Sequence, residues 1–119
     1  MKEGIKEIFH DLEKISQSGL ISDLKVIEKT KSILKARLYF SEELFVQVYV
    51  NVKKPKISYS LILNDRRIFG KDCIFGQWHL HPFERPDEHD ESEIAQEAIT
   101  IEEFVEKAFF IASDKLNII

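Results

Sequence analysis

The sequence predicts an α+β domain: a five-stranded, curved antiparallel meander sheet covered by N-terminal and C-terminal amphipathic helices. Three observations predict this class. Apolar residues recur at helical spacing at both ends of the chain, they alternate with polar residues between positions 22 and 74, and turn motifs separate the alternating runs. The chain has 119 residues, 44% of them hydrophobic, which suits one domain with its own core, so we expect a single domain over residues 1–119.

The first predicted element is a helix over residues 2–18. Its apolar positions repeat with the spacing of an amphipathic helix, at Ile5, Ile8, Phe9, Leu12 and Ile15. Gly19 follows at the position where glycine commonly ends a helix. His10 falls outside the apolar stripe, so we expect it on the exposed side.

Strands are predicted from the period of two that follows. Residues 34–40, 44–52 and 57–63 alternate in the way of strands with one face on a core and one facing out. Strands near 22–30 and 66–75 would complete five. The runs are separated at hairpin spacing by Ser41-Glu42-Glu43, Lys53-Lys54-Pro55 and Asn64-Asp65.

The last predicted element is a helix that begins at Thr100. Thr100 and Glu103 form a capping-box pattern, which places Thr100 at the N-cap. Apolar residues then repeat at helical spacing, at Ile101, Phe104, Val105, Ala108 and Ile111.

Composition narrows the function classes. No apolar run approaches the roughly 20 residues of a membrane helix, and the start lacks a signal-peptide core, so we expect a cytoplasmic protein without membrane contact. Cys73 is alone in an apolar run, which indicates a small core residue and no disulfide framework. Residues 84–106 hold ten acidic groups against Arg85 alone. Such a segment is typical of a solvated loop and helix face, of a surface for a charged partner, or of pairing with the mildly basic remainder of the chain.

The candidate site lies where three of the four histidines gather. His79 and His81 are two residues apart, so an extended segment would place both on one face. They could act as an acid–base pair on a phosphodiester, as in metal-free ribonucleases. They could bind Zn²⁺ or Ni²⁺ with His89 or Asp87. They could also be structural histidines at a strand end, hydrogen-bonded to neighbours or to a partner. We assign no metal ion to these residues and expect no cofactor.

Weaker candidates lie on the predicted sheet. Arg66 and Arg67 could grip phosphate, although after Asn64-Asp65 they are typical of a hairpin turn with solvated arginines. Cations with aromatics on strands hold RNA in some proteins, but the same mixture is ordinary on an exposed sheet. The outward residues of this kind are Lys35, Arg37, Tyr39, Gln47 and Tyr49.

Four segments carry a family resemblance: Ile57-Ser58-Tyr59-Ser60-Leu61, Phe69-Gly70-Lys71-Asp72, His79-Leu80-His81-Pro82 and Thr100-Ile101-Glu102-Glu103-Phe104. In this order, over roughly residues 25–112, the chain resembles the TumE family of small toxin–antitoxin proteins. The chain departs from the family pattern by its N-terminal helix and by a longer acidic insertion after Pro82.

The resemblance implies the toxin component of a type II toxin–antitoxin module, neutralised by a small DNA-binding helix-turn-helix antitoxin. RNA or the translation machinery is the expected target. The family supplies no established catalytic residue, so the roles of His79 and His81 rest on chemistry alone. Two alternatives remain open: a non-enzymatic interaction module, as a homodimer or an acidic surface mimic of nucleic acid, and a metal-binding hydrolase that uses His79, His81 and His89.

Overall fold

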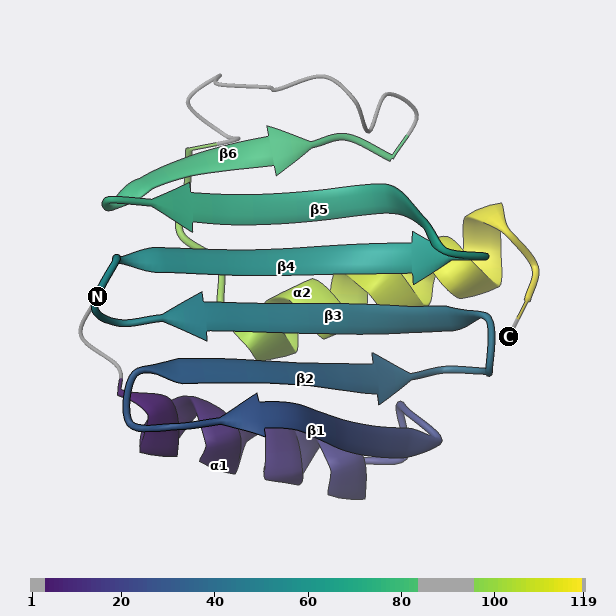
Figure 1. The fold of residues 1–119 in the computed structure, drawn as a ribbon. Coiled ribbons are helices and arrows are strands. Elements are labelled where there is room, and N and C mark those ends of the chain that lie inside the picture. Colours follow the sequence, from purple (N-terminus) through teal and green to yellow (C-terminus); the bar gives the residue numbers. More distant parts are fainter. Residues whose placement is uncertain (1–3, 84–95, 119) are drawn as a thin grey trace.

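The computed structural model describes residues 4–83 and 96–118 and has the α+β architecture that the sequence predicts (Figure 1). Helix α1 (Ile5–Gln17) precedes the sheet, and α2 (Ile101–Phe110) follows it and continues as a π-helix over Ile111–Lys115. The strands are β1 (Asp23–Lys29), β2 (Ile33–Tyr39), β3 (Leu44–Asn51), β4 (Lys56–Leu63), β5 (Arg66–Ile74) and β6 (Gln77–His81). Each strand pairs antiparallel with the next, which makes the sheet a meander.

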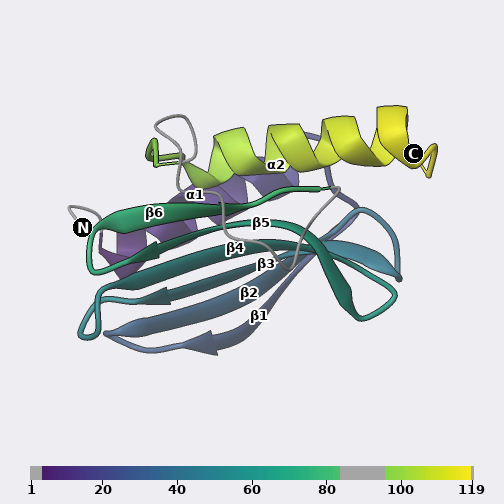
Figure 2. The same ribbon diagram turned by 90° about the horizontal axis from the view of Figure 1, so that it is seen from above.

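The molecule has two layers. Both helices lie on one face of the sheet (Figure 2). Helix α1 contacts β1 and β2, and α2 lies behind the middle strands in the view of Figure 1. The core lies between the layers, where Leu12 of α1, Phe104 of α2 and Val48 of β3 are fully buried. The opposite face has no described helix on it, and we call it the open face.

The end of α1 and the start of α2 agree with the sequence prediction, whereas α1 begins at Ile5 and not at residue 2. Ser18 is the C-cap of α1, and Gly19 follows it with a φ of +87°, a left-handed conformation that glycine adopts at low cost. Thr100 is the N-cap of α2: its hydroxyl accepts the Glu103 N–H at 3.1 Å, and the Glu103 carboxylate accepts the Thr100 N–H at 2.9 Å. His10 is exposed, in agreement with its place outside the apolar stripe.

The prediction of five strands is wrong, because the chain turns once more and adds β6. The extra turn is Phe75-Gly76, with φ values of +49° and +82°, between the paired residues Ile74 and Gln77. Two central residues with positive φ define the type I′ turn, which usually carries Asn-Gly or Asp-Gly. Phenylalanine gives no such signal, so the sequence conceals this turn.

The predicted curvature is also wrong: the sheet twists but does not curl (Figure 2). Curling needs bulges or glycine kinks repeated across the strands. The described strands have two register shifts, one between Val26 and Glu28 in β1 and one opposite Leu61 and Ile62 in β5. Two irregularities on separate strands leave the sheet open.

Cys73 lies on the covered face, buried and unbridged, and burial raises the pKa of its thiol. A buried neutral thiol behaves as a small apolar residue, as the sequence predicts. Within the described ranges, no helix is long and apolar enough to cross a membrane.

Candidate functional site

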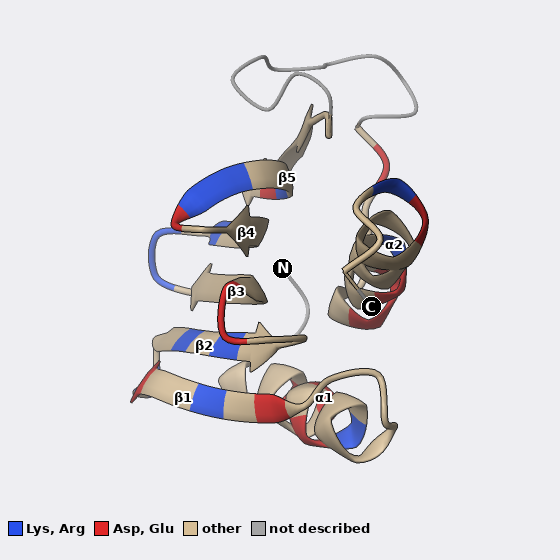
Figure 3. Ribbon diagram, turned by 90° about the vertical axis from the view of Figure 1, so that its right-hand side faces the viewer, with Lys and Arg blue, Asp and Glu red and all other residues tan. Residues whose placement is uncertain are grey.

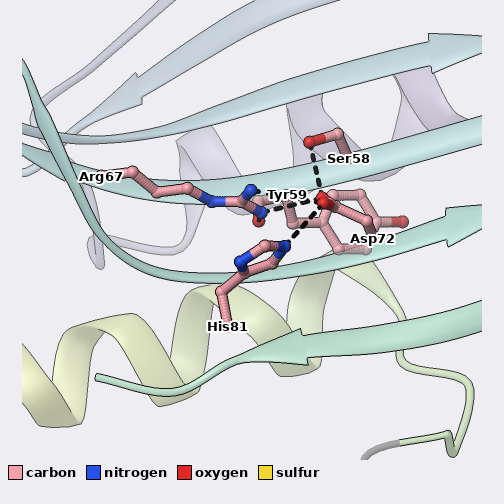
Figure 4. Close-up of polar contacts among 5 residues, drawn as sticks. All are labelled: Ser58, Tyr59, Arg67, Asp72 and His81. Atoms are coloured by element: carbon pink, nitrogen blue, oxygen red, sulfur yellow. Dashed lines mark hydrogen bonds and ion pairs between the residues drawn. The ribbon is translucent and has the colours of Figure 1, made fainter. Parts of the chain in front are cut away.

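A polar cluster on the open face of β4, β5 and β6 is centred on the carboxylate of Asp72 (Figure 4). Ser58 donates its hydroxyl to Oδ1 at 2.7 Å, and Arg67 donates through Nη2 to Oδ1 at 2.8 Å and through Nη1 to Oδ2 at 3.2 Å. His81 Nε2 lies 3.1 Å from Oδ2. We call Ser58, Arg67, Asp72 and His81 the Asp72 cluster.

A β-bulge places Arg67 within reach of Asp72. Leu61 pairs with Phe69 but Ile62 pairs with Arg67, so Ile68 is the extra residue of β5. In a regular strand, residues five apart point to opposite faces. The extra residue Ile68 shifts the alternation of side chains along β5 by one position. Arg67 and Asp72 therefore both lie on the open face, although they are five residues apart.

Gly70 makes room for the Arg67 guanidinium. A Cβ atom built on Gly70 would overlap Nη2, Nε and Cζ of Arg67. Because residue 70 lacks a side chain, the guanidinium lies flat over the strand and also donates to the Tyr59 carbonyl at 3.2 Å. Gly70 therefore serves the close approach of a side chain to the backbone, a known use of glycine inside a strand.

The charge on Asp72 is stabilised by its partners. Burial alone would raise the pKa of the carboxyl group, but the hydrogen bonds and charge of Arg67, with smaller contributions from Ser58 and His81, lower it overall. Asp72 is therefore ionised at neutral pH. An ionised carboxylate beside an imidazole fixes the orientation and the tautomer of the ring.

Both histidines of the predicted pair lie on the open face. His79 is in register with Asp72 and His81 with Gly70, while Trp78 and Leu80 pack against the core on the covered side. His81 is buried at 8% exposure, whereas His79 is half-buried. Carboxylate, imidazole and guanidinium groups in one cluster can transfer protons and stabilise a developing negative charge.

Of the weaker candidates Arg66, Arg67 and Tyr49, the structure places only Arg67 in contact with Asp72. Arg66 is exposed beside the Asn64-Asp65 turn, as predicted, but Arg67 is paired with Asp72, so its interpretation as a solvated turn residue is wrong. Tyr49 lies two strands from Asp72 in one cross-strand row, with Ser58 between them. The structure therefore brings Arg67 to the histidines and leaves Arg66 and Tyr49 outside the cluster.

Metal ligands are not assembled in the described part of the chain. Among residues 4–83 and 96–118, no three histidine, cysteine or carboxylate side chains are placed to hold a metal ion. The predicted third ligands, His89 and Asp87, lie outside the described residues.

The rest of the open face carries cations in contact with aromatic rings. Lys25 Nζ lies 5.3 Å from the centre of the Tyr39 ring, and Arg37 Cζ lies 4.8 Å from the centre of the Phe45 ring. Figure 3 places lysine and arginine on β1, β2 and β5 and acidic residues on β1. Of these, Lys29 and Lys71 belong to the covered face. This mixture continues from the edge strand β1 toward the Asp72 cluster.

Sequence reasoning missed Asp72 and Ser58 as members of the site. Two signals were present in residues 66–74: a lone carboxylate inside an apolar strand, and an isolated glycine two residues before it. A glycine inside a strand pattern indicates a bulge or a close approach. The bulge cannot be recognised from the alternation of polar and apolar residues, because both Arg67 and Ile68 are ordinary residues at the start of a strand.

Comparisons of the chain with protein-family models, with curated proteins and with solved structures found no match.

Proposed function

We propose that this protein is the toxin of a two-gene module and that it cleaves RNA on the open face of its sheet. The observation that carries the proposal is the pairing of His81 with an ionised, Arg67-bound Asp72 on the same face as His79. The cation and aromatic contacts of β1, β2 and β3 on that face support a nucleic-acid strand as substrate. The resemblance of four segments to the TumE family supports the toxin role and a helix-turn-helix antitoxin as partner.

The chemistry proposed is an internal displacement within RNA. One neutral imidazole of the His79–His81 pair accepts the proton of a ribose 2′-hydroxyl, whose oxygen attacks the adjacent phosphorus. The other imidazole, protonated, gives its proton to the departing 5′ oxygen, which leaves a 2′,3′-cyclic phosphate. The Arg67 guanidinium stabilises the negative charge that develops on the phosphate oxygens.

A second candidate is a structural role for the cluster, with the open face acting as a binding surface only. Asp72 and His81 are 9% and 8% exposed, and Asp72 is bonded to partners on β4, β5 and β6. A buried network of this kind can fasten an edge strand to a sheet without doing chemistry. Under this candidate the protein would act by occupying a partner's surface.

Expression of single-residue variants separates the two candidates. His79→Ala and His81→Ala should each reduce RNA cleavage about 10²–10⁴-fold and relieve growth inhibition in protein that remains folded at the assay temperature. His10→Ala is the matched control, because His10 is exposed on α1 away from the open face. Variants that lose stability but cleave RNA at the rate of the wild type would favour the structural role.

Co-expression tests the partner. A helix-turn-helix protein encoded beside this gene should restore growth and copurify with the chain. Growth that is unaffected by strong expression of folded wild-type protein would contradict the toxin role.

A further inference from the structure

One end of the sheet presents an exposed aromatic residue among lysines. Phe75, in the β5–β6 turn, is 76% exposed, and its neighbour Ile74 is 39% exposed. The Phe75 N–H donates to the Pro55 carbonyl at 2.8 Å, which joins this turn to the β3–β4 turn. That turn adds the exposed lysines Lys53, Lys54 and Lys56, and residues 51–57 and 73–78 contain no carboxylate.

A phenylalanine at position 75 is unfavourable for two reasons: its backbone conformation is strained, and its apolar ring is exposed to water. Its φ of +49° lies in the left-handed region, which a bulky residue adopts only at a cost. The chain makes a similar turn at Asn64-Asp65, with φ values of +49° and +65°, from residues that tolerate this region. The turn conformation disfavours phenylalanine, and the ring contributes little to the core because it is 76% exposed. Neither the turn nor packing therefore accounts for a phenylalanine at this position.

We call the end of the sheet formed by the β3–β4 and β5–β6 turns, with Lys53, Lys54, Lys56 and Phe75, the Phe75 end. It adjoins the Asp72 cluster on the open face. Ile74 pairs with Lys56 on one side and Gln77 on the other, and the next open-face row contains Ser58, Asp72 and His79. Successive residues on one face of a strand are about 7 Å apart, close to the spacing of adjacent nucleotides in an extended strand. A strand bound at the cluster would therefore pass over Lys56 and reach the turn.

We propose that Phe75 stacks on an unpaired base of single-stranded RNA while Lys53, Lys54 and Lys56 contact the neighbouring phosphates. The inference rests on the proposed function and names its substrate class. A ring that projects from a turn can reach a base only where that base is unstacked, which excludes a duplex. The lysines match a polyanion, and their flexible ammonium groups contact phosphates without reading sequence.

The test is the affinity of the full chain for a fluorescently labelled, 12-nucleotide single-stranded RNA, measured by anisotropy with His81→Ala as background to prevent cleavage. Added to that background, Phe75→Asn should weaken binding about tenfold, the usual size of one lost stacking contact. The same change should raise the melting temperature, since it copies the favourable Asn64 turn. Opposite signs for stability and affinity cannot come from loss of fold.

Two further variants complete the design. Phe75→Trp should keep the affinity, because indole stacks at least as well as a phenyl ring. Phe110→Gln removes a phenylalanine that is 52% exposed and belongs to α2, which lies on the opposite face of the sheet from the Asp72 cluster, and should leave RNA binding unchanged. A duplex of the same sequence should bind more weakly than the single strand and should not respond to Phe75→Asn.

The outcomes that overturn the inference are distinct from failure of the proposed function. If wild-type protein neither binds nor cleaves RNA, the proposed function fails and the stacking role fails with it. If wild-type protein binds RNA and Phe75→Asn binds equally well, only the stacking role is overturned. If Phe75→Asn instead abolishes binding to phosphatidylserine-containing vesicles and leaves RNA binding intact, the Phe75 end is a membrane-surface anchor.

Discussion

The Arg67 guanidinium occupies the space that a side chain on Gly70 would fill. This relationship links two features of β5: the bulge at Ile68 turns Arg67 to the open face, and Gly70 lets the side chain lie flat against the sheet. Together they place two guanidinium nitrogens on the Asp72 carboxylate, at 2.8 and 3.2 Å. The ion pair therefore depends on a residue that has no side chain of its own.

Gly70→Ala should consequently break the Arg67–Asp72 pair while leaving the fold intact. The overlapping atoms belong to a flexible side chain, which can swing away from an added methyl group. We expect a loss of about 2 kcal/mol of unfolding free energy, the scale of hydrogen bonds to a charged group, measured by urea titration. Arg67→Ala should cost a similar amount.

The double variant Gly70→Ala/Arg67→Ala tests whether the two residues act through one contact. If they do, it should be little less stable than either single variant, because the same interaction is lost once. Arg66→Ala is the control, since Arg66 is exposed, and it should change stability by less than about 0.5 kcal/mol. Fully additive losses would contradict the coupling.

Acid should remove the contribution of Asp72 to stability. The folded-state pKa of this carboxyl group lies below its ordinary value of about 4, because Arg67, Ser58 and His81 outweigh its burial. The contribution is complete above about pH 5, where the carboxyl group is ionised in both states. As the pH falls further, the unfolded chain takes up the proton first, and the contribution is lost as the pH passes the folded pKa.

Urea midpoints of wild type and Asp72→Asn between pH 7 and pH 2.5 measure this effect. The variant should be less stable at pH 7, and the difference should shrink toward the acid end. Because other carboxyl groups titrate in both proteins, their effects largely cancel in the difference. A stability difference that stayed constant with pH would contradict the lowered pKa.

Phe104 should dominate the contact between α2 and the sheet. Its ring is fully buried, with ring centres 5.5 Å from Tyr59 and 5.2 Å from Phe69. Phe104→Ala should cost about 3–5 kcal/mol, through lost burial and the cavity left behind. Phe110→Ala, on the exposed side of the same helix, should cost much less in the same thermal or urea unfolding experiment.

The sequence predicts the repetitive parts of this fold and misses its irregular ones. The helices are visible because packing repeats at Ile5, Ile8 and Leu12, and the Thr100 cap follows local hydrogen-bonding chemistry. The turn at Phe75 was missed because its residue type opposes its conformation. A prediction from residue preferences alone therefore lacks the last strand, β6.

The candidate site was found only in part, for a related reason. The pair His79 and His81 is local, so its common face follows from spacing alone. The contacts of Asp72 with Ser58 and His81 depend on strand register, and those with Arg67 depend on the bulge that moves this residue to the open face. Register and bulges arise from pairing between strands, which a single alternating pattern does not encode.

The most direct test of the proposed function is the chemistry of the RNA ends after incubation with purified protein in the presence of a chelator. Acid–base catalysis by His79 and His81 predicts fragments that end in a 2′,3′-cyclic phosphate, and no cleavage of the same strand with 2′-O-methyl groups. It also predicts a loss of about 10²–10⁴-fold in rate for His81→Ala, measured on protein that remains folded at the assay temperature. RNA that stays intact, or cleavage at the wild-type rate by folded His79→Ala and His81→Ala proteins, would contradict the account.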